Sequence, residues 1–237
     1  YIKNGLGKNW RFLAVLYSAF GVLTVFGTGN ATQVNTITTA IDTALINFNV
    51  ISESSTGRLN LILGIVITLL VGMVLLGGIK RIGSVSEKLV PFMALFYIVL
   101  ALGVVILNIG RVPAVFHDIV YGAFNPSAVT GGVVGTMIVS MQKGVARGIF
   151  SNEAGLGSAP IAAAAAQTKE PVRQGLVSMT GTFIDTIVIC TMTGLSIVLT
   201  GAWQVEGLEG VQVTTYAFQH GLPIPGQVSA FVLMICL

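Results

Sequence analysis

The chain has 237 residues, of which 54% are hydrophobic and 9% are charged, and its mean hydropathy is +0.88. Because about a quarter of the residues in a soluble domain are charged, this composition excludes an ordinary soluble domain and indicates an all-α polytopic membrane protein. The net charge of +3 does not indicate a nucleic-acid partner, because the basic residues lie between the apolar segments rather than in one patch. Cys190 and Cys236 lie within apolar segments, which is typical of small buried residues rather than of a disulfide or metal framework.

Both ends of the sequence favour a fragment of a longer membrane protein. The chain begins at Tyr1 with no initiator methionine, and it stops within an apolar segment that ends at Leu237. We therefore expect one transmembrane domain, 1–237, that lacks its N-terminal and C-terminal helices.

Long intervals without charged residues predict the membrane spans. Three such intervals in the first half of the chain each hold roughly 20 residues or more, enough for a helix to cross a hydrocarbon core about 30 Å thick. The predicted spans are 12–41, 59–79, 89–110, 119–142, 175–200 and 227–237, of which the last is cut off by the end of the sequence.

The predicted loops alternate in charge along the chain. The loops 1–11, 80–88 and 143–173 carry an excess of Lys and Arg, whereas the loop 201–225 contains two Glu residues and neither Lys nor Arg. Because basic residues mark cytoplasmic loops, we expect the three basic loops on the inner side of the cell (inner) membrane.

A run of helix breakers falls inside the predicted span 119–142. Pro126 and the pair Gly131-Gly132 are expected to interrupt this span within 125–133. In hydrocarbon an unpaired backbone amide costs several kcal/mol, so a broken helix persists only where it is buried in protein or lines a wet cavity. Discontinuous helices near the middle of the membrane point to the binding site of a transporter.

The broken segment is the first candidate for substrate contact. Free N–H groups at the start of a half-helix suit the carboxylate of an amino acid, and unwound carbonyl groups suit its ammonium group. We assign Thr130, Gly131, Gly132 and Val133 to this role. The alternative is a glycine patch at a contact between helices.

A second polar cluster lies in the first predicted span. Phe26, Asn30 and Gln33 are spaced to share one face of a continuous helix. They are candidates for lining the substrate pocket, with the Phe26 ring as an apolar wall. Hydrogen bonding between helices is the alternative.

Charged and amide side chains supply candidates for gating or ion relay. Asp185 is the carboxylate that lies well inside a predicted span, so we consider it as a proton or cation relay. The alternative is a structural pairing with Arg147 or with a helix N-terminus. Arg147, Asn152 and Glu153 are candidates for a cytoplasmic gate, with a solvated loop as the alternative.

Nothing in the sequence favours an enzyme. His117 and His220 lie isolated in predicted outer loops, and the sequence contains no metal-binding spacing, phosphate-binding loop or pairing of nucleophile and base. We therefore expect no catalytic residue and no cofactor apart from a coupling ion.

Several motifs resemble those of the alanine or glycine:cation symporter family, the sodium:alanine symporters of bacteria and archaea. The longest is GVARGIFSNEAGLGSAPI at 144–161. The resemblance extends along the chain through Tyr1-Ile2, the segments at 5–7, 26–30 and 78–83, PVRQG at 171–175 and FIDT at 183–186.

The resemblance implies a leucine-transporter-like helix bundle with five-plus-five inverted repeats and broken first and sixth helices. The chain would run from the third core helix into the eighth, and its interrupted span would be the sixth. Residues of the sixth and third helices would then contribute to the pocket. This role is assigned to 130–133 in the sixth helix and to Phe26, Asn30 and Gln33 in the third. Relatives often have an aromatic residue at the position of Val133, so a larger pocket is expected here.

The resemblance also implies sodium-coupled symport of small neutral amino acids, such as alanine or glycine, by alternating access. The sodium site is expected largely on the first core helix, which this chain lacks. A proton-coupled transporter or exchanger of the same fold, with Asp185 as proton carrier, is the nearest alternative. A channel subunit and a membrane-embedded enzyme are further alternatives, and the oligomeric state stays open.

Overall fold

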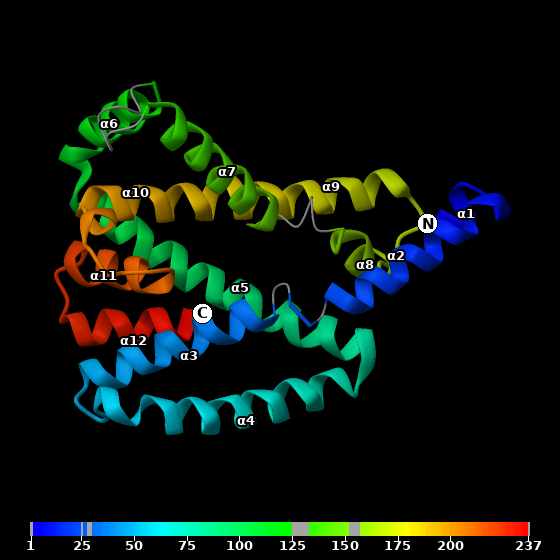
Figure 1. Cartoon of the computed structure of the whole chain (residues 1–237), viewed down its shortest axis with the longest axis horizontal. Helices are drawn as coiled ribbons and strands as arrows, with labels where there is room; N and C mark the ends of the chain where they lie inside the picture. The colour runs from blue at the N-terminus through cyan, green and yellow to red at the C-terminus, as the bar shows by residue number, and fades with distance from the viewer. Residues whose placement is uncertain (1, 25, 28–29, 125–132, 152–156, 237) are drawn as a thin grey trace.

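The computed structural model describes residues 2–24, 26–27, 30–124, 133–151 and 157–236. Within these ranges the regular structure is helical, and no β-strand occurs (Figure 1). Three of the described helical stretches are long and apolar enough to cross a membrane: Thr56–Leu75, Gly78–Leu107 and Pro171–Thr200. The chain is therefore an all-helical protein with helices of membrane-spanning length.

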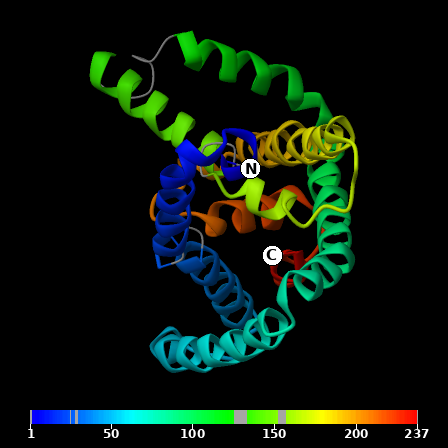
Figure 2. The same ribbon diagram turned by 90° about the vertical axis from the view of Figure 1, so that its right-hand side faces the viewer.

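Five helices pack against one another at the centre of the described structure. They are α3 (Asn30–Asn47), α5 (Gly78–Leu107), α10 (Cys190–Thr200), α11 (Val211–Gly221) and α12 (Gly226–Cys236). Helix α12 packs on α3, α11 and α5, and α10 packs on α5 and α11. Figure 2 views the molecule end-on, with the C-terminus near the middle and α3, α4 and α5 around it.

The core of this group combines a few large side chains with small ones. Ala101, Val104, Phe218 and Leu233 form a buried cluster in which three of the helices meet. Gly221 lies so close to α5 that a Cβ atom there would stand 2.7 Å from a methyl carbon of Val104. Small residues permit such close approach, which is how helices gain packing energy in a membrane.

Helix α4 (Thr56–Leu75) leads into α5 through a sharp reversal, from which the two helices spread apart (Figure 1). The chain reverses at Leu76 and Gly77, and Gly78 has a φ of +68°, a left-handed conformation that favours glycine. The range 80–88, predicted as a loop, forms the first turns of α5. Charged side chains end the apolar part of a helix but not the helix itself, and at 1.5 Å per residue α5 is longer than the hydrocarbon core.

The predicted span 12–41 consists of two helices rather than one. Helix α2 (Arg11–Thr24) ends in a turn in which the N–H of Gly27 donates to the carbonyl of Thr24 at 3.2 Å, and α3 begins at Asn30. Glycine lowers helix stability by about 1 kcal/mol relative to alanine, and Thr and Asn side chains compete for backbone hydrogen bonds. The polar run that follows Phe26 therefore favours a helix end.

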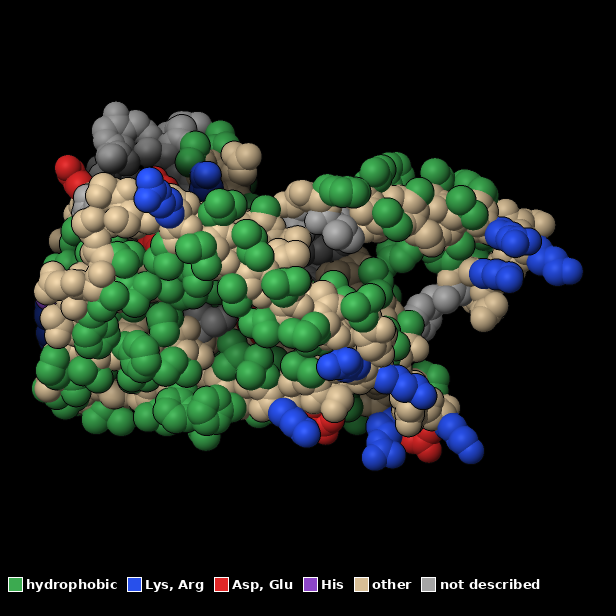
Figure 3. Space-filling view, turned by 90° about the horizontal axis from the view of Figure 1, so that it is seen from below, with side chains coloured by type: hydrophobic (Ala, Val, Ile, Leu, Met, Phe, Trp, Pro, Cys, Tyr) green, Lys and Arg blue, Asp and Glu red, His purple; other side chains and the backbone are tan. Residues whose placement is uncertain are grey.

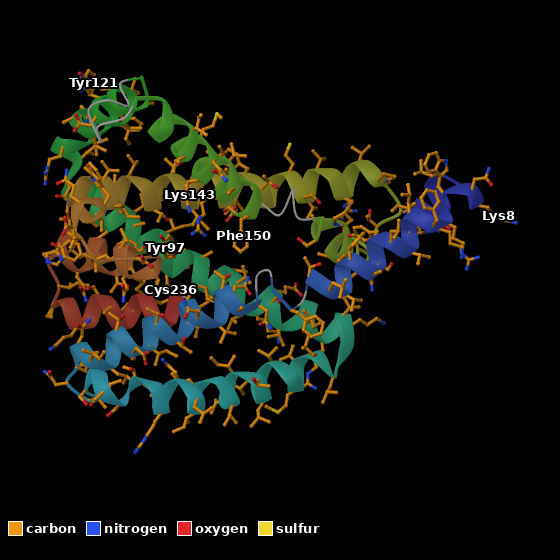
Figure 4. All side chains as sticks on the ribbon, viewed as in Figure 1. Lys8, Tyr97, Tyr121, Lys143, Phe150 and Cys236 are labelled. Carbon is orange, nitrogen blue, oxygen red and sulfur yellow. The ribbon has the colours of Figure 1, made fainter. Side chains whose placement is uncertain are left out.

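Two helices flank the predicted interruption. Helix α6 (Val112–Phe124) ends before it, and α7 (Val133–Ser151) begins after it and crosses beside the long helix that contains α10 (Figure 1). The residues between them, 125–132, lie outside the described part of the chain. Residues 143–151, predicted as part of an inner loop, are the last turns of α7. Lys143 and Phe150, labelled in Figure 4, belong to these turns.

Most of the basic side chains gather at one end of the molecule (Figure 3). This end, here named the basic end, comprises residues 2–11, the reversal at 76–81 and residues 164–173, and Lys8 lies at its tip (Figures 1 and 4). The connections α3–α4, α5–α6 and α10–α11 lie at the opposite end. The basic segments that alternate along the sequence with less basic ones therefore lie together at one end of the folded chain.

Candidate functional site

The predicted substrate residues fall in two places. Thr130, Gly131 and Gly132 lie outside the described residues, and Val133 is described only as the first backbone position of α7. An α-helix leaves its first four N–H groups without partners in the helix, and the start of α7 at Val133 is one such terminus.

The residues of the second predicted cluster are all exposed. Asn30 and Gln33 lie three residues apart in the first turn of α3, so they share a face of that helix. Phe26 lies in the turn before α3 and is 83% exposed. Asn30 and Gln33 therefore share one face of α3, whereas Phe26 lies before that helix and is not on this face.

Asp185 contacts a residue that the sequence reasoning did not single out. The Oγ atom of Ser151, the last residue of α7, donates a hydrogen bond to Oδ2 of Asp185 at 2.6 Å. The hydroxyl of Thr186 lies 3.5 Å from the same oxygen, and Sγ of Cys190 lies 3.4 Å from Oγ of Ser151. The three elements α7, η5 (Phe183–Ile189) and α10 thus meet at one half-buried carboxylate.

The helix that carries Asp185 is irregular at this point. The segment η5, between α9 (Pro171–Thr182) and α10, is a π-helix, in which the N–H of Cys190 donates to the carbonyl of Asp185, five residues earlier. Short π-helical turns inside α-helices are rare and are frequently found at functional sites. The irregular turn coincides with a carboxylate inside an apolar stretch of membrane-spanning length, so Asp185 is the described candidate with the most structural features around it.

Within the described residues, the carboxylate of Asp185 is not paired with Arg147, which was one of the two structural alternatives. Arg147 is exposed on α7, and among the residues described no ion pair joins it to Asp185. The carboxylate instead has a neutral hydroxyl donor, Ser151, which lies one helical turn after Arg147. Asn152 and Glu153, the other gate candidates, lie outside the described residues.

The chemistry of this site suits a hard cation or a proton. Carboxylate and hydroxyl oxygens are the ligands that hard cations prefer, and a carboxylate in a span is also a natural proton carrier. Within the described ranges, no group of three or more His, Cys, Asp or Glu side chains is arranged to hold a metal ion.

A second contact that the sequence analysis missed lies in the core. The hydroxyl groups of Tyr97, in α5, and Thr193, in α10, share a hydrogen bond of 2.5 Å. The Tyr97 ring also packs on Phe218, with ring centroids 5.6 Å apart. The two side chains are 96 residues apart, so no spacing within one segment indicates that they meet. Each lies in an apolar segment, where a polar group needs a partner.

Comparison with known proteins decides the family. Residues 1–237 match the model of the sodium:alanine symporter family. The chain belongs to this family. The resemblance drawn from the 144–161 motif is thereby confirmed.

Curated relatives of this sodium:alanine symporter family member are transporters by name. This chain is 54% identical over 224 residues to an uncharacterized transporter of Haemophilus influenzae, and the alignment covers 94% of this chain and 46% of the relative. It is 45% identical over 226 residues to the sodium/alanine symporter AgcS of Methanococcus maripaludis, covering 94% and 46%. It is 38% identical over 217 residues to the probable sodium/glutamine symporter GlnT of Bacillus subtilis, covering 90% and 41%.

The chain spans about half the length of the curated relatives it matches. Family membership and the apolar helices establish a membrane protein of a cation-coupled amino-acid symporter family.

Proposed function

We propose that the chain forms part of a secondary active transporter that couples inward movement of sodium to the uptake of a small neutral amino acid, such as alanine or glycine. The observation that carries this proposal is the family match over the whole chain, together with a relative that is named as a sodium/alanine symporter. Transport follows alternating access in a leucine-transporter-like bundle, to which this chain contributes the third to the eighth core helices.

The substrate site of this proposal lies around the start of α7. Residues 130–133 contact the carboxylate and ammonium groups of the amino acid, and Phe26, Asn30 and Gln33 are the second proposed contribution to the pocket. Support comes from the end of α6 at Phe124 and the start of α7 at Val133, which leave a helix N-terminus beside the predicted residues. Such a site matches the charges of the substrate with backbone dipoles and needs no formal charge of its own.

Sodium is the proposed coupling ion, and its main site is expected on the first core helix, outside this chain. Asp185 is the proposed relay residue within the chain. Its support is the hydrogen bond from Ser151, which ties the end of α7 to the π-helical segment. A change of charge at Asp185 thus reaches both helices through described contacts.

The proposed orientation has the basic end on the cytoplasmic side of the inner membrane. It is supported by the gathering of Lys and Arg at that end in Figure 3 and by the positive-inside rule. Arg147, Asn152 and Glu153 are then candidates for a gate between the substrate site and the cytoplasm.

The test is uptake of radiolabelled alanine into proteoliposomes that contain the intact protein, with and without an inward sodium gradient. Uptake that requires sodium, competes with unlabelled glycine and falls in Gly132→Leu supports both the coupling and the pocket. Uptake of glutamine in preference to alanine would correct the substrate, as expected if Val133 enlarges the pocket.

Proton coupling is the second candidate function, and one observation favours it. Asp185 is a half-buried carboxylate with a neutral donor, in the membrane-length stretch Pro171–Thr200. Under this alternative, alanine uptake follows an inward proton gradient without sodium. That result would overturn sodium coupling and leave the transporter assignment in place.

A further inference from the structure

Two polar side chains meet where α3 packs on α4. Nδ2 of Asn60, in the second turn of α4, donates a hydrogen bond of 2.9 Å to Oδ2 of Asp42, which lies in the last turns of α3. The α3–α4 connection, which separates the two residues in the sequence, lies at the end of the molecule opposite the basic end (Figure 1). The pair is therefore a polar contact between two helices close to that end.

The hydrogen bond leaves each of the two side chains with an unused oxygen. Oδ1 of Asp42 and Oδ1 of Asn60 are buried from solvent, and neither has a hydrogen-bond partner among the described residues. Most buried polar side-chain atoms in proteins are paired, and an unpaired one calls for a water, an ion or a functional role. Nδ2 of Asn47 is also buried without a partner in the described part, but it is a donor and is not assigned to the same site.

The negative charge of Asp42 is not compensated by a basic side chain in the described part of the chain. Asp42 makes no ion pair there, and Arg58, two residues before Asn60 in α4, is exposed. Burying a charged oxygen without a partner costs stability, because the oxygen loses its hydration and gains nothing in return. The contact therefore needs a positive charge that the described side chains do not provide.

The chemistry of the two unused oxygens suits a small cation. Each is bonded to the carbon that also carries one atom of the 2.9 Å hydrogen bond, so both lie in the same small region between α3 and α4. Carboxylate and amide carbonyl oxygens are the ligands that hard cations prefer. One carboxylate balances a single positive charge, whereas calcium is held by a larger set of oxygens with several negative charges. The pair therefore favours a monovalent cation.

We propose that Asp42 and Asn60 form a binding site for a monovalent cation of the size of sodium, with Oδ1 of each side chain as a ligand. Water completes the coordination from the nearby connection, where Asn49 and Ser54 are exposed. The site is additional to the main sodium site proposed outside this chain and to Asp185, and its existence does not rest on the transport function. In the proposed orientation it takes its ion from the outer side of the membrane.

The test is hydrogen–deuterium exchange of the intact protein in detergent, read by mass spectrometry in sodium chloride and in choline chloride of equal ionic strength. Choline is too large for a buried site between two side chains. A bound ion slows the exchange of amides whose local opening releases it, by a factor of one plus the ratio of ion concentration to dissociation constant. With sodium at about ten times its dissociation constant, we expect about tenfold slower exchange in peptides 38–47 and 56–64. Equal exchange of these peptides in both salts would overturn the proposal.

Asp42→Asn separates an ion site from a purely structural contact, because it keeps the shape of the side chain and removes the charge. We expect sodium to lose its effect on both peptides, while exchange in choline is no faster than in the parent. Asp118→Asn is the matched control, since its side chain is 73% exposed and pairs with His117, and it should keep the sodium effect. A sodium effect that persists in Asp42→Asn, or faster exchange of this variant in choline, would reject the site.

Asn60→Asp tests whether both positions face one ion. A second carboxylate suits a divalent cation, so calcium should slow exchange in this variant about tenfold at concentrations that leave the parent unchanged. Unchanged exchange in α5 and α10 verifies that the variant is folded. A folded Asn60→Asp that does not respond to calcium would show that the two side chains do not share an ion. Protection of the parent by calcium and not by sodium would overturn the assignment to a monovalent cation.

Discussion

Ser151 and Asp185 are 34 residues apart in the sequence, yet the hydroxyl of one donates to the carboxylate of the other at 2.6 Å. The contact joins the end of α7 to a π-helical segment inside a stretch of membrane-spanning length. A carboxylate is costly within a membrane unless it has partners or a function. The contact therefore brings the charge of Asp185 to the place where two helices of the proposed transport pathway meet.

Asp185→Asn should lower sodium-driven alanine uptake by on the order of tenfold to a hundredfold, the usual cost of altering a residue that supports an ion site. The substitution preserves shape and removes the charge. Initial uptake rates in proteoliposomes, at matched protein content, measure the effect. Asp118→Asn is the control, because its side chain is 73% exposed and pairs with its neighbour His117, and a comparable loss in that variant would remove the special role of Asp185.

Ser151→Ala should weaken the response to sodium because it removes the donor that positions the carboxylate. A hydrogen bond to a charged group contributes about 1.5–3 kcal/mol, so we expect a rise of about tenfold or more in the sodium concentration that gives half-maximal uptake. Ser151→Thr keeps the hydroxyl and should restore most of the response. Identical sodium curves for Ser151→Ala and the parent would show that the bond is only structural.

Gly221→Ala should destabilise the fold by about 1–3 kcal/mol, the cost of overfilling a packed core. The new methyl group would stand 2.7 Å from a methyl carbon of Val104. Thermal unfolding in detergent, followed by a fluorescent thiol probe, measures the change. Gly194→Ala, where nothing lies within 4 Å of the added carbon, should not destabilise. Val104→Ala should rescue Gly221→Ala in part in the double variant, because Cγ2 of Thr200 also lies 3.0 Å from the added carbon.

Tyr97→Phe should cost about 1 kcal/mol of stability, because it breaks the hydroxyl contact between α5 and α10 and leaves the ring in place. A double-mutant cycle with Thr193→Val isolates the pair, since Thr193 also donates to the carbonyl of Ile189. Additive effects of the two substitutions would mean that the contact contributes nothing by itself.

The orientation predicts which side of the membrane each charged position faces. Lys8→Cys and Lys80→Cys should react with an impermeant maleimide only in inside-out vesicles, and Glu206→Cys only in right-side-out vesicles. All three positions are exposed, so their reactivity reports sidedness rather than burial. Labelling of Glu206→Cys and Lys8→Cys from the same side would contradict the proposed topology.

Hydropathy and charge determined the class of this protein and much of its layout. Membrane helices need long apolar segments because hydrocarbon offers no partner for polar groups, and the apolar segments 59–79 and 89–110, predicted as spans, overlap the membrane-length helices Thr56–Leu75 and Gly78–Leu107. The 144–161 motif likewise determined the family, which the match over the whole chain confirmed. Both features are local, since they depend on residue type and spacing along the chain.

Only the tertiary structure decided where helices end and which distant side chains meet. Charges at 80–88 predicted a loop, but α5 continues through them because helices extend beyond the hydrocarbon core. The contacts Ser151–Asp185 and Asp42–Asn60 follow from how separate helices pack, which no spacing within one segment can encode. Sequence therefore determined what each helix is made of, and packing decided which of its polar groups act together.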